Sequence, residues 1–157
     1  MAVQGRDGDM VQLVCRNGVN VVNTMKKTTQ LVTAKIELPS NLRGNTPLLK
    51  MDDGKHICLV HWRGVENNMD YYHNFAVFGR NMQVESISRS FKFDNVFPTE
   101  FCSSMFNLID SSQIGITVCE NDCFQYLYVI EKDKLLEFIN GGEQKPSLKM
   151  DKKMDDI

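Results

Sequence analysis

Long hydrophobic runs are absent from this sequence of 157 residues, in which uninterrupted apolar stretches extend over only a few positions. A membrane-spanning helix requires about 20 consecutive apolar residues, so we expect no membrane association. The first nine residues, MAVQGRDGD, carry three charges and two glycines and lack the apolar segment of a secretion signal. The sequence therefore indicates an intracellular protein, cytoplasmic or nuclear.

An excess of charge of either sign is also absent. Lysine and arginine together number 18 and aspartate and glutamate 20, which gives a formal net charge of −2 and a pI of about 5.9. Nonspecific nucleic-acid binding normally requires a concentrated basic face. The charge balance therefore weighs against a nucleic-acid partner, although Arg80, Arg89 and Lys92 are candidates for a local basic patch.

The cysteine content does not fit a disulfide framework. The five cysteines are an odd number spread over the chain, and no Asn-x-Ser/Thr glycosylation sequence accompanies them. Secreted disulfide scaffolds more often have an even and denser set. We expect free, mostly buried thiols in a reducing compartment. They are Cys15, Cys58, Cys102, Cys119 and Cys123.

Motifs for catalysis and cofactor binding are missing as well. Neither Gly-x-Ser-x-Gly nor a phosphate-binding glycine pattern occurs. Cys119 and Cys123 flank a tight turn and have the spacing of half a zinc site. Because no second close pair of cysteines is present, we interpret both as core cysteines. On a strand, His56 and Cys58 would share one face while His61 points to the other. A Cys–His pair brought together by the fold stays an alternative. The sequence favours a protein that is not an enzyme and has no metal and no cofactor.

The composition is that of a folded domain. Hydrophobic residues make up 42% of the chain and charged residues 24%, which is ordinary for globular proteins. We predict a single domain over residues 10–142. Residues 1–9 are predicted to be flexible, and residues 143–157 lack an apolar period and are predicted to form a disordered tail.

Alternating apolar residues predict a series of strands. Asn17-Gly18 indicates a hairpin turn after the first of them, because both positions tolerate positive φ; a short helix from Val19 to Lys27 is the competing interpretation of the segment after the turn. The apolar phase shifts between Val84 and Ile87, which suggests a β-bulge or an edge strand. Residues 39–55 are predicted to be the longest loop, a surface excursion or a binding loop. The predicted strands are 10–16, a second from 19, 29–37, 55–62, 75–79, 82–93, 114–118 and 124–130, with a tight turn at 120–122.

Two helices are predicted near the end of the chain. Phe101, Met105 and Ile109 follow a helical spacing, and Thr99 after Pro98 is a suitable N-cap. We therefore predict a main helix over about residues 99–110 and a short C-terminal helix over residues 134–139. The predicted fold class is α+β, a mostly antiparallel β-sheet packed on the main helix.

The order of predicted elements from Phe97 to Ile139 is similar to the second half of a DNA sliding-clamp repeat. That half contains a long strand, a helix and further strands, here SSQIGITV and CFQYLYVI. The resemblance implies a clamp-like role in genome maintenance and rests on patterning without a diagnostic motif. A pleckstrin-like fold, a β-sandwich with a terminal helix, resembles residues 124–139 equally well. The sequence therefore assigns the chain to neither family.

Aromatic residues carry the remaining functional signal. Together with several phenylalanines, Tyr71 and Tyr72 could form a base-stacking platform on a sheet, or the rings could pack that sheet against the predicted main helix. Tyr71-Tyr72-His73 precedes a predicted strand and is expected to be exposed. Trp62-Arg63 lies across one loop from these tyrosines, and Trp, Tyr and Arg are the residues that dominate interface hot spots. A core tryptophan beside an exposed arginine is the alternative.

We therefore expect a non-enzymatic protein–protein interaction module, a subunit or adaptor of an intracellular complex. Its partner would be another protein, recognised through an aromatic patch or an exposed strand edge. The alternative is a nucleic-acid-associated or clamp-like factor. The oligomeric state does not follow from the sequence. The expected partner-binding residues are Trp62, Arg63, Tyr71 and Tyr72, and the nucleic-acid alternative would use Arg80, Arg89 and Lys92.

Overall fold

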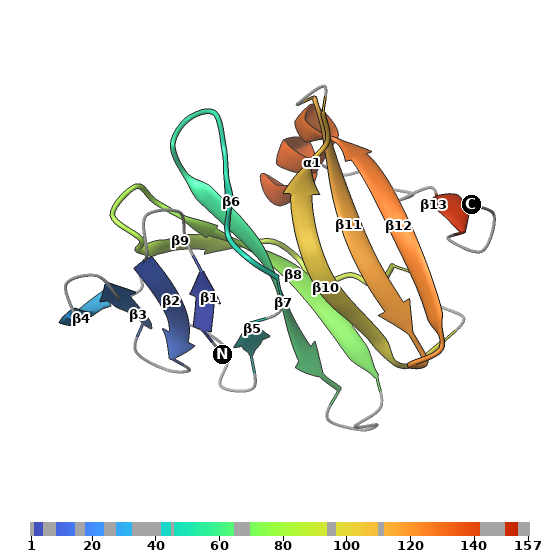
Figure 1. Ribbon diagram of the computed structural model, residues 1–157, viewed down its shortest axis with the longest axis horizontal. Coiled ribbons are helices and arrows are strands. Elements are labelled where there is room, and N and C mark those ends of the chain that lie inside the picture. The colour runs from blue at the N-terminus through green and yellow to red at the C-terminus, as the bar shows by residue number, and fades with distance from the viewer. Residues whose placement is uncertain are drawn as a thin grey trace.

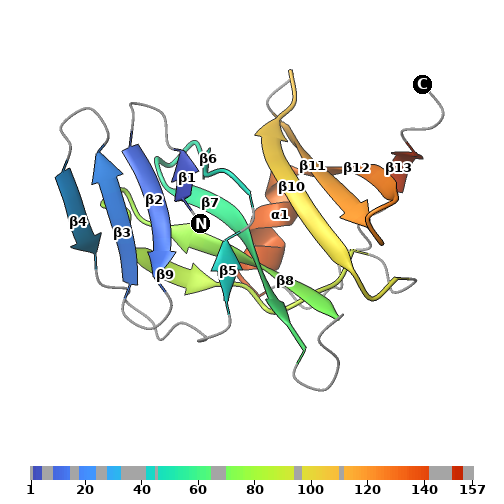
Figure 2. The ribbon, with the colours of Figure 1, turned by 60° about the horizontal axis from the view of Figure 1, so that its bottom comes forward.

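The computed structural model describes residues 2–4, 9–14, 18–23, 28–32, 42–44, 46–64, 70–93, 97–109, 112–141 and 150–153. Across these residues the chain forms three antiparallel sheets and one short helix (Figure 1). The second sheet lies between the other two (Figures 1 and 2). A mostly antiparallel β architecture, as predicted, is therefore confirmed. Among the described residues, no helix has the length and apolar character needed to cross a membrane.

The N-terminal sheet is a meander in the order β1-β2-β3-β4. Strands β2 and β3 form the predicted hairpin, but they pair up to Val14 opposite Gly18, so Gly18 belongs to β3 and is not, as predicted, a central residue of the turn. A strand, and not the competing helix, follows Gly18, as the β-branched valines favour. Asn17 and Cys15 lie outside the described residues. The strands are β1 (Ala2–Gln4), β2 (Asp9–Val14), β3 (Gly18–Asn23) and β4 (Thr28–Val32).

The second sheet is centred on β7 (His56–Arg63) and β8 (Tyr71–Phe78), which pair along their whole length. Apolar side chains occupy both faces of β7. Leu59 is buried on one face and Cys58 and Val60 on the other. The sequence of a strand that is buried on both faces contains a continuous apolar run, and here that run is ICLV at residues 57–60.

The other edge of β7 pairs with two short strands, β5 (Arg43–Gly44) and β6 (Leu49–Lys50). Both lie within residues 39–55, so the prediction of a loop is wrong for part of this range. Residues 39–41 and 45 lie outside the described part of the chain. Strands of two residues cannot display an apolar alternation, so they leave no recognisable pattern in the sequence.

Strand β9 (Val84–Ile87) forms the edge of the second sheet. Val84 of β9 is opposite Phe78 of β8, and Ser86 is opposite Val77. Glu85 therefore has no opposite residue and is the extra residue of a β-bulge. The phase shift in the sequence is thus confirmed as a bulge on an edge strand. The longer strand predicted over 82–93 is interrupted, and only Phe91 returns to the sheet, through an isolated bridge to His73.

The third sheet has the strand order β10-β11-β12-β13. Asn121 and Asp122 have φ values of +50° and +55°, the left-handed conformations of the tight turn between β11 and β12. The two predicted strands on either side of this turn are confirmed. The strands are β10 (Glu100–Asn107), β11 (Gln113–Glu120), β12 (Phe124–Glu131) and β13 (Met150–Lys153).

Two of the short strands lie in the terminal ranges for which the sequence predicts no regular structure. Strand β1 lies within residues 1–9, and β13 lies within residues 143–157, where it pairs with β12. The rest of both ranges is outside the described residues, apart from Asp9 in β2. The boundaries of a single domain over 10–142 stay a prediction.

The predicted main helix over 99–110 is wrong, because this segment forms β10. A bulge between Cys102 and Ser104 shifts the strand by one residue, so that Cys102 and Met105 both point into the core. This three-residue spacing of inward side chains imitates a helical period. Ile109, the last member of the predicted helical face, is fully exposed in the turn after β10. The similarity to a sliding-clamp repeat therefore loses the helix on which it depended.

The short C-terminal helix is confirmed as α1 (Lys132–Ile139). Leu135, Phe138 and Ile139 lie on its buried side. The helix ends before Gly141, which has a φ of +90°, a conformation that glycine adopts without a steric penalty. This is the one helix among the described residues, so helical packing is a minor part of the fold.

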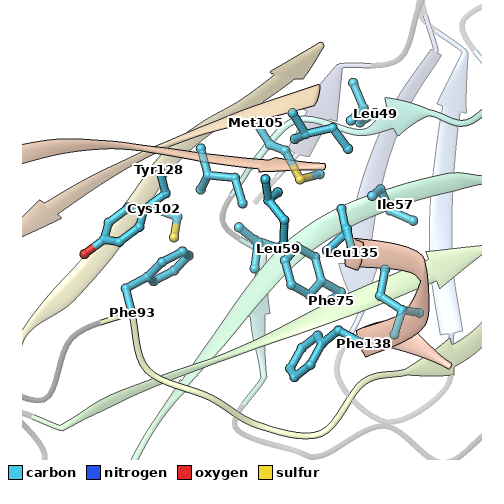
Figure 3. Close-up of a cluster of buried hydrophobic side chains, with 14 of the residues drawn as sticks. Leu49, Ile57, Leu59, Phe75, Phe93, Cys102, Met105, Tyr128, Leu135 and Phe138 are labelled. Atoms are coloured by element: carbon cyan, nitrogen blue, oxygen red, sulfur yellow. The ribbon is translucent and has the colours of Figure 1, made fainter. Parts of the chain in front are cut away.

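The main hydrophobic core lies between the second and third sheets and against α1. Figure 3 shows side chains of β7, β8, β10 and α1 meeting there. Phe75 of β8 stacks on Phe91 with ring centroids 5.3 Å apart and meets Phe138 of α1 edge-on at 6.1 Å. The buried members of this core are Leu49, Met51, Ile57, Leu59, Phe75, Val77, Phe93, Cys102, Met105, Ile114, Ile116, Val118, Tyr126, Tyr128, Ile130, Leu135, Phe138 and Ile139.

A second cluster covers the opposite face of the second sheet, the face turned toward the N-terminal sheet (Figure 2). Trp62 packs against its margin. The second sheet is therefore buried on both sides, and most residues of its strands β7 and β8 are buried. The buried members of the second cluster are Leu42, Cys58, Val60, Ala76, Phe78 and Val84.

Ile116→Ala tests the core at the middle of β11. Ile116 is fully buried, so its truncation removes apolar contacts and leaves a cavity, and we expect a loss of about 2–5 kcal/mol in the free energy of unfolding. Ile109→Ala makes the same chemical change at a fully exposed position and should leave stability nearly unchanged. Urea unfolding followed by circular dichroism measures both. Equal losses in the two variants would contradict the position of the core.

Candidate functional site

The predicted partner-binding residues lie together at one end of the β7–β8 hairpin. Trp62 is directly opposite Tyr72, and Arg63 is directly opposite Tyr71. Because side chains alternate along a strand, the two pairs point to opposite faces of the second sheet. The structure thus gathers the four residues at one place but divides them between two surfaces.

On the first surface, Trp62 and Tyr72 stack with ring centroids 4.6 Å apart and an interplanar angle of 15°. The indole Nε1–H of Trp62 lies 3.2 Å from both Asn74 Oδ1 and Ser90 Oγ. Asn74 is fixed in turn, because its Nδ2 donates a 2.7 Å hydrogen bond to the carbonyl of Ser88. The hydrogen bonds to Asn74 and Ser90 orient the indole ring. Both rings are half-buried, so part of each ring remains accessible to solvent.

A lysine adjoins this aromatic pair. Lys92 Nζ lies 5.6 Å from the centroid of Tyr72, within the range of a cation–π contact. The same ammonium group lies 3.4 Å from Asp70 Oδ1. We call Trp62, Tyr72 and Lys92 the Trp62 surface.

On the opposite face, Arg63 donates a hydrogen bond to the hydroxyl of Tyr71, and its guanidinium carbon lies 4.9 Å from the centroid of that ring. Tyr71 stacks on His61 at 5.3 Å, and Phe101 meets His61 edge-on at 5.7 Å. Tyr71 and His73 are buried, so the prediction that Tyr71-Tyr72-His73 is exposed is wrong for these two residues. They belong to β8, which begins four residues earlier than the predicted strand.

The cations of the nucleic-acid alternative do not form one patch. Arg80 follows the far end of β8 and donates two hydrogen bonds, of 3.0 and 2.7 Å, to the carbonyl of Asp53. Arg89 lies over the ring of Phe138 in α1, with its guanidinium carbon 4.9 Å from the centroid. Lys92 belongs to the Trp62 surface.

A shallow depression of about 450 Å³ lies beside Arg80. Its charges are already paired in part, because Lys55 Nζ lies 3.1 Å from Glu85 Oε2. The lining combines two basic and two acidic side chains, so the depression has no preference for a ligand of one charge. It is lined by Asp53, Lys55, Gly79, Arg80, Asn81 and Glu85.

One histidine and two glutamates are fully buried: His73, Glu100 and Glu120. Glu100 Oε2 accepts a 3.0 Å hydrogen bond from the backbone N–H of Phe93 and lies 3.8 Å from His73 Nδ1. Burial, reinforced by the charges of His61 and Lys92, lowers the pKa of His73 to about 3. The imidazole is therefore neutral near pH 7, and its approach to Glu100 is a packing contact and not an ion pair.

The described residues contain no group of three or more His, Cys, Asp or Glu side chains arranged to hold a metal ion. His56 and Cys58 share one face of β7 and His61 lies on the other, as alternation predicts. Cys119 is half-buried and Cys123 is exposed, so the prediction that these two are core cysteines is wrong.

The two buried thiols are poorly suited to nucleophilic chemistry. Burial raises the pKa of Cys58 to about 12, and burial together with the charge of Glu100 raises the pKa of Cys102 well above its usual value. The thiolate is the reactive form, so both groups are held in the unreactive state.

Arg43 is a site residue that sequence reasoning missed. It lies in β5, directly opposite His61, and both Arg43 and Arg63 lower the pKa of His61, although burial is the larger cause. The sequence offers little signal, because Arg43 stands among the polar residues between Pro39 and Pro47. Only the pairing of β5 with β7 brings it to the hairpin.

In comparisons with protein-family models, curated proteins and solved structures, no match to this chain was found.

The buried imidazole of His73 predicts acid sensitivity. Its pKa of about 3 lies below the value of about 6.5 expected in the unfolded chain, so below about pH 6.5 the unfolded state binds more protons. Stability is therefore lost as the pH falls, and we expect His73 to account for about 2 kcal/mol between about pH 7 and pH 5. Urea unfolding at the two pH values measures the loss.

His73→Phe provides the matched variant. Both ring nitrogens of His73 are buried with no hydrogen-bond partner among the described residues, and the ring packs near Phe91 and Phe93. Phenylalanine should therefore maintain stability near pH 7 and remove this part of the acid sensitivity. An unchanged loss between the two pH values in His73→Phe would contradict the assignment.

Proposed function

We propose that this chain is a non-enzymatic protein-interaction module that recognises a segment of another protein at the end of the β7–β8 hairpin. The observation that carries the proposal is the Trp62–Tyr72 stack, in which two half-buried rings are held by hydrogen bonds to Asn74 and Ser90. Tryptophan and tyrosine are enriched in binding hot spots. They offer a large contact area at a small entropic cost when they are fixed before binding.

The chemistry of the Trp62 surface supports a protein partner. Its rings provide apolar area, and two basic side chains adjoin them: Lys92, which is also paired with Asp70, and Arg63 on the other face of the hairpin end. A partner segment with an aromatic or aliphatic anchor and nearby acidic groups would match both features. The buried position of His73 and Glu100 and the raised pKa of the Cys58 thiol support a role without catalysis.

Trp62 also has a structural role, because it packs on the second cluster. A change of this residue to alanine would remove core contacts together with any contact to a partner. Tyr72 is therefore the better residue with which to separate binding from folding, since it stacks on Trp62 and is not a member of that cluster.

Tyr72→Ala should weaken partner recovery and leave the fold intact. The lost ring stacking should cost no more than about 1.5 kcal/mol of stability, while a hot-spot contact is worth about 2 kcal/mol or more in binding. The measurement is affinity capture from the native host followed by mass spectrometry, with melting temperatures in parallel. Phe124→Ala removes an exposed ring from β12, outside the Trp62 surface, and is the control. Equal recovery with Tyr72→Ala and the unmodified chain would contradict the proposed surface.

Nucleic-acid binding is the rival function, and it predicts a different salt response. Each phosphate neutralised by a cation releases a counterion, so affinity must fall steeply with salt. With a net charge of −2 and three separated cations, we expect weak or no binding to short single- or double-stranded oligonucleotides at about 150 mM salt. Fluorescence anisotropy across a salt series measures it. Submicromolar binding that weakens with salt and is lost in Arg80→Ala or Arg89→Ala would favour the rival.

A further inference from the structure

The outer face of the third sheet is the side of β10, β11 and β12 that is turned away from the main core, and its middle is apolar. The buried residues of these strands pack against the second sheet and α1, so alternation turns the residues between them outward. Phe106 of β10 is directly opposite Gly115 of β11, which is directly opposite Val129 of β12. In the next row on the same side, Leu127 of β12 is opposite Thr117 of β11.

The ring of Phe106 lies over Gly115, in the space that a side chain at that position would need. A Cβ atom on Gly115 would stand 2.7 Å from two carbons of the Phe106 ring and 3.3 Å from Leu127 Cδ1. The ring is thus folded down onto the sheet, where it adjoins Leu127, and it still remains 36% exposed. The glycine therefore gives this face a level apolar middle that a second sheet can cover.

Polar side chains of the outer face are hydrogen-bonded to one another. The hydroxyl oxygens of Ser103 and Ser104 lie 2.7 and 2.8 Å from Thr117 Oγ1. Beyond the apolar middle, Gln113 Nε2 donates a 2.6 Å hydrogen bond to Glu131 Oε1. Covering a polar group is costly mainly when the group loses water and gains no partner. Because these groups already have partners, the face can be covered at a lower cost.

The charge of the outer face indicates what covers it. Glu131 is the one charged residue that alternation in β10, β11 and β12 places on this face, and it lies at the margin. A nucleic acid or a strongly charged protein would find no complementary charge there. A second copy of the same neutral face would meet no like-charge repulsion, and a two-fold contact uses the same patch on both copies.

We propose that the outer face of the third sheet is the contact of a homodimer, in which two copies pack these sheets face to face about a two-fold axis. Sheets packed in this way lie about 10 Å apart, and their side chains interdigitate. Phe106 and Leu127 make the central contacts. Strands of eight residues span about 26 Å and three neighbouring strands about 14 Å, so each copy offers about 370 Å². A stable interface buries about 800 Å² per partner, so this dimer is a dissociable one.

The dimer contact is separate from the proposed function. It is made by the third sheet, whereas the Trp62 surface belongs to the second sheet and to Lys92. One dimer therefore presents two Trp62 surfaces, and a partner with two binding segments would gain affinity from the linkage. Tyr72→Ala should dimerise as the unmodified chain does, so failure of the dimer and failure of the Trp62 surface are distinguishable.

Analytical ultracentrifugation of the full-length chain tests the dimer directly. The chain has a mass of 18.0 kDa, and a reducing agent in the buffer excludes disulfide-linked species. Between about 5 and about 500 μM we expect a reversible monomer–dimer equilibrium with its midpoint in the micromolar range. A chain that stays monomeric over this whole range would overturn the proposal.

Variants assign the contact to the outer face. Phe106→Glu and Leu127→Glu should each weaken dimerisation about hundredfold, because symmetry places two unpaired carboxylates in one apolar contact. Phe106→Leu keeps the apolar contact and should still dimerise. Phe124→Glu is the matched control, since Phe124 is also 36% exposed and alternation places it on the other side of β12. Melting temperatures check the fold of each variant. Undiminished dimerisation in both outer-face variants, or equal weakening in Phe124→Glu, would overturn the assignment.

Cys119 provides a measurement that needs no variant. Its half-buried thiol lies on the outer face, two residues along β11 from Thr117, whereas the exposed Cys123 lies in the turn that follows. The rate of alkylation by excess N-ethylmaleimide is measured for each cysteine by peptide mapping. As the protein concentration rises through the midpoint, the rate at Cys119 should fall and the rate at Cys123 should stay constant. An unchanged rate at Cys119 while the dimer forms would place the contact elsewhere and overturn the proposal.

Discussion

The pairing of β7 with β8 is the interaction on which the rest of this structure depends. The two strands pair from His56 opposite Phe78 to Arg63 opposite Tyr71, and both faces of the ladder are covered by apolar clusters. One face supplies Leu59 and Phe75 to the core shared with the third sheet. The other supplies the second cluster. Because side chains alternate along a strand, the single register of this ladder determines which residues enter each cluster and which emerge together at its end.

That register also explains why the candidate site has two sides. The last two pairs of the ladder lie at the end where the chain passes from β7 to β8, beyond the enclosed middle, and their side chains are large and mostly polar. The Trp62–Tyr72 pair continues the face of the second cluster, and the Arg63–Tyr71 pair continues the face of the main core. A slip of one residue would exchange the two faces and bury a guanidinium group in place of an indole. A partner that wraps the hairpin end would meet rings on one side and arginines on the other.

Much of the strand pattern follows from the sequence, and the errors have identifiable physical causes. The strands of 114–118 and 124–130, the turn at Asn121 and the bulged edge strand all display a local signal, because one face is apolar and the turn requires left-handed residues. The bulge in β10 caused the wrong prediction of a helix over 99–110, because it places Cys102 and Met105 on one face at a helical spacing. The site could be predicted only in part. The residue types and spacing of Trp62, Arg63, Tyr71 and Tyr72 indicate them as candidates, whereas the position of Arg43 beside them depends on the long-range pairing of β5, which leaves no local trace.

The segment from Ser88 to Phe93 connects the core to the Trp62 surface. Phe91 and Phe93 point into the core, where they contact Phe138 and Tyr128, and Glu100 of β10 accepts a hydrogen bond from the N–H of Phe93. The alternate residues Ser90 and Lys92 face the other way, to Trp62 and Tyr72. Burying the Glu100 carboxylate is costly unless it is satisfied, so the bond that satisfies it also fixes where this segment lies. The third sheet, which contributes no residue to the Trp62 surface, thus helps to position it.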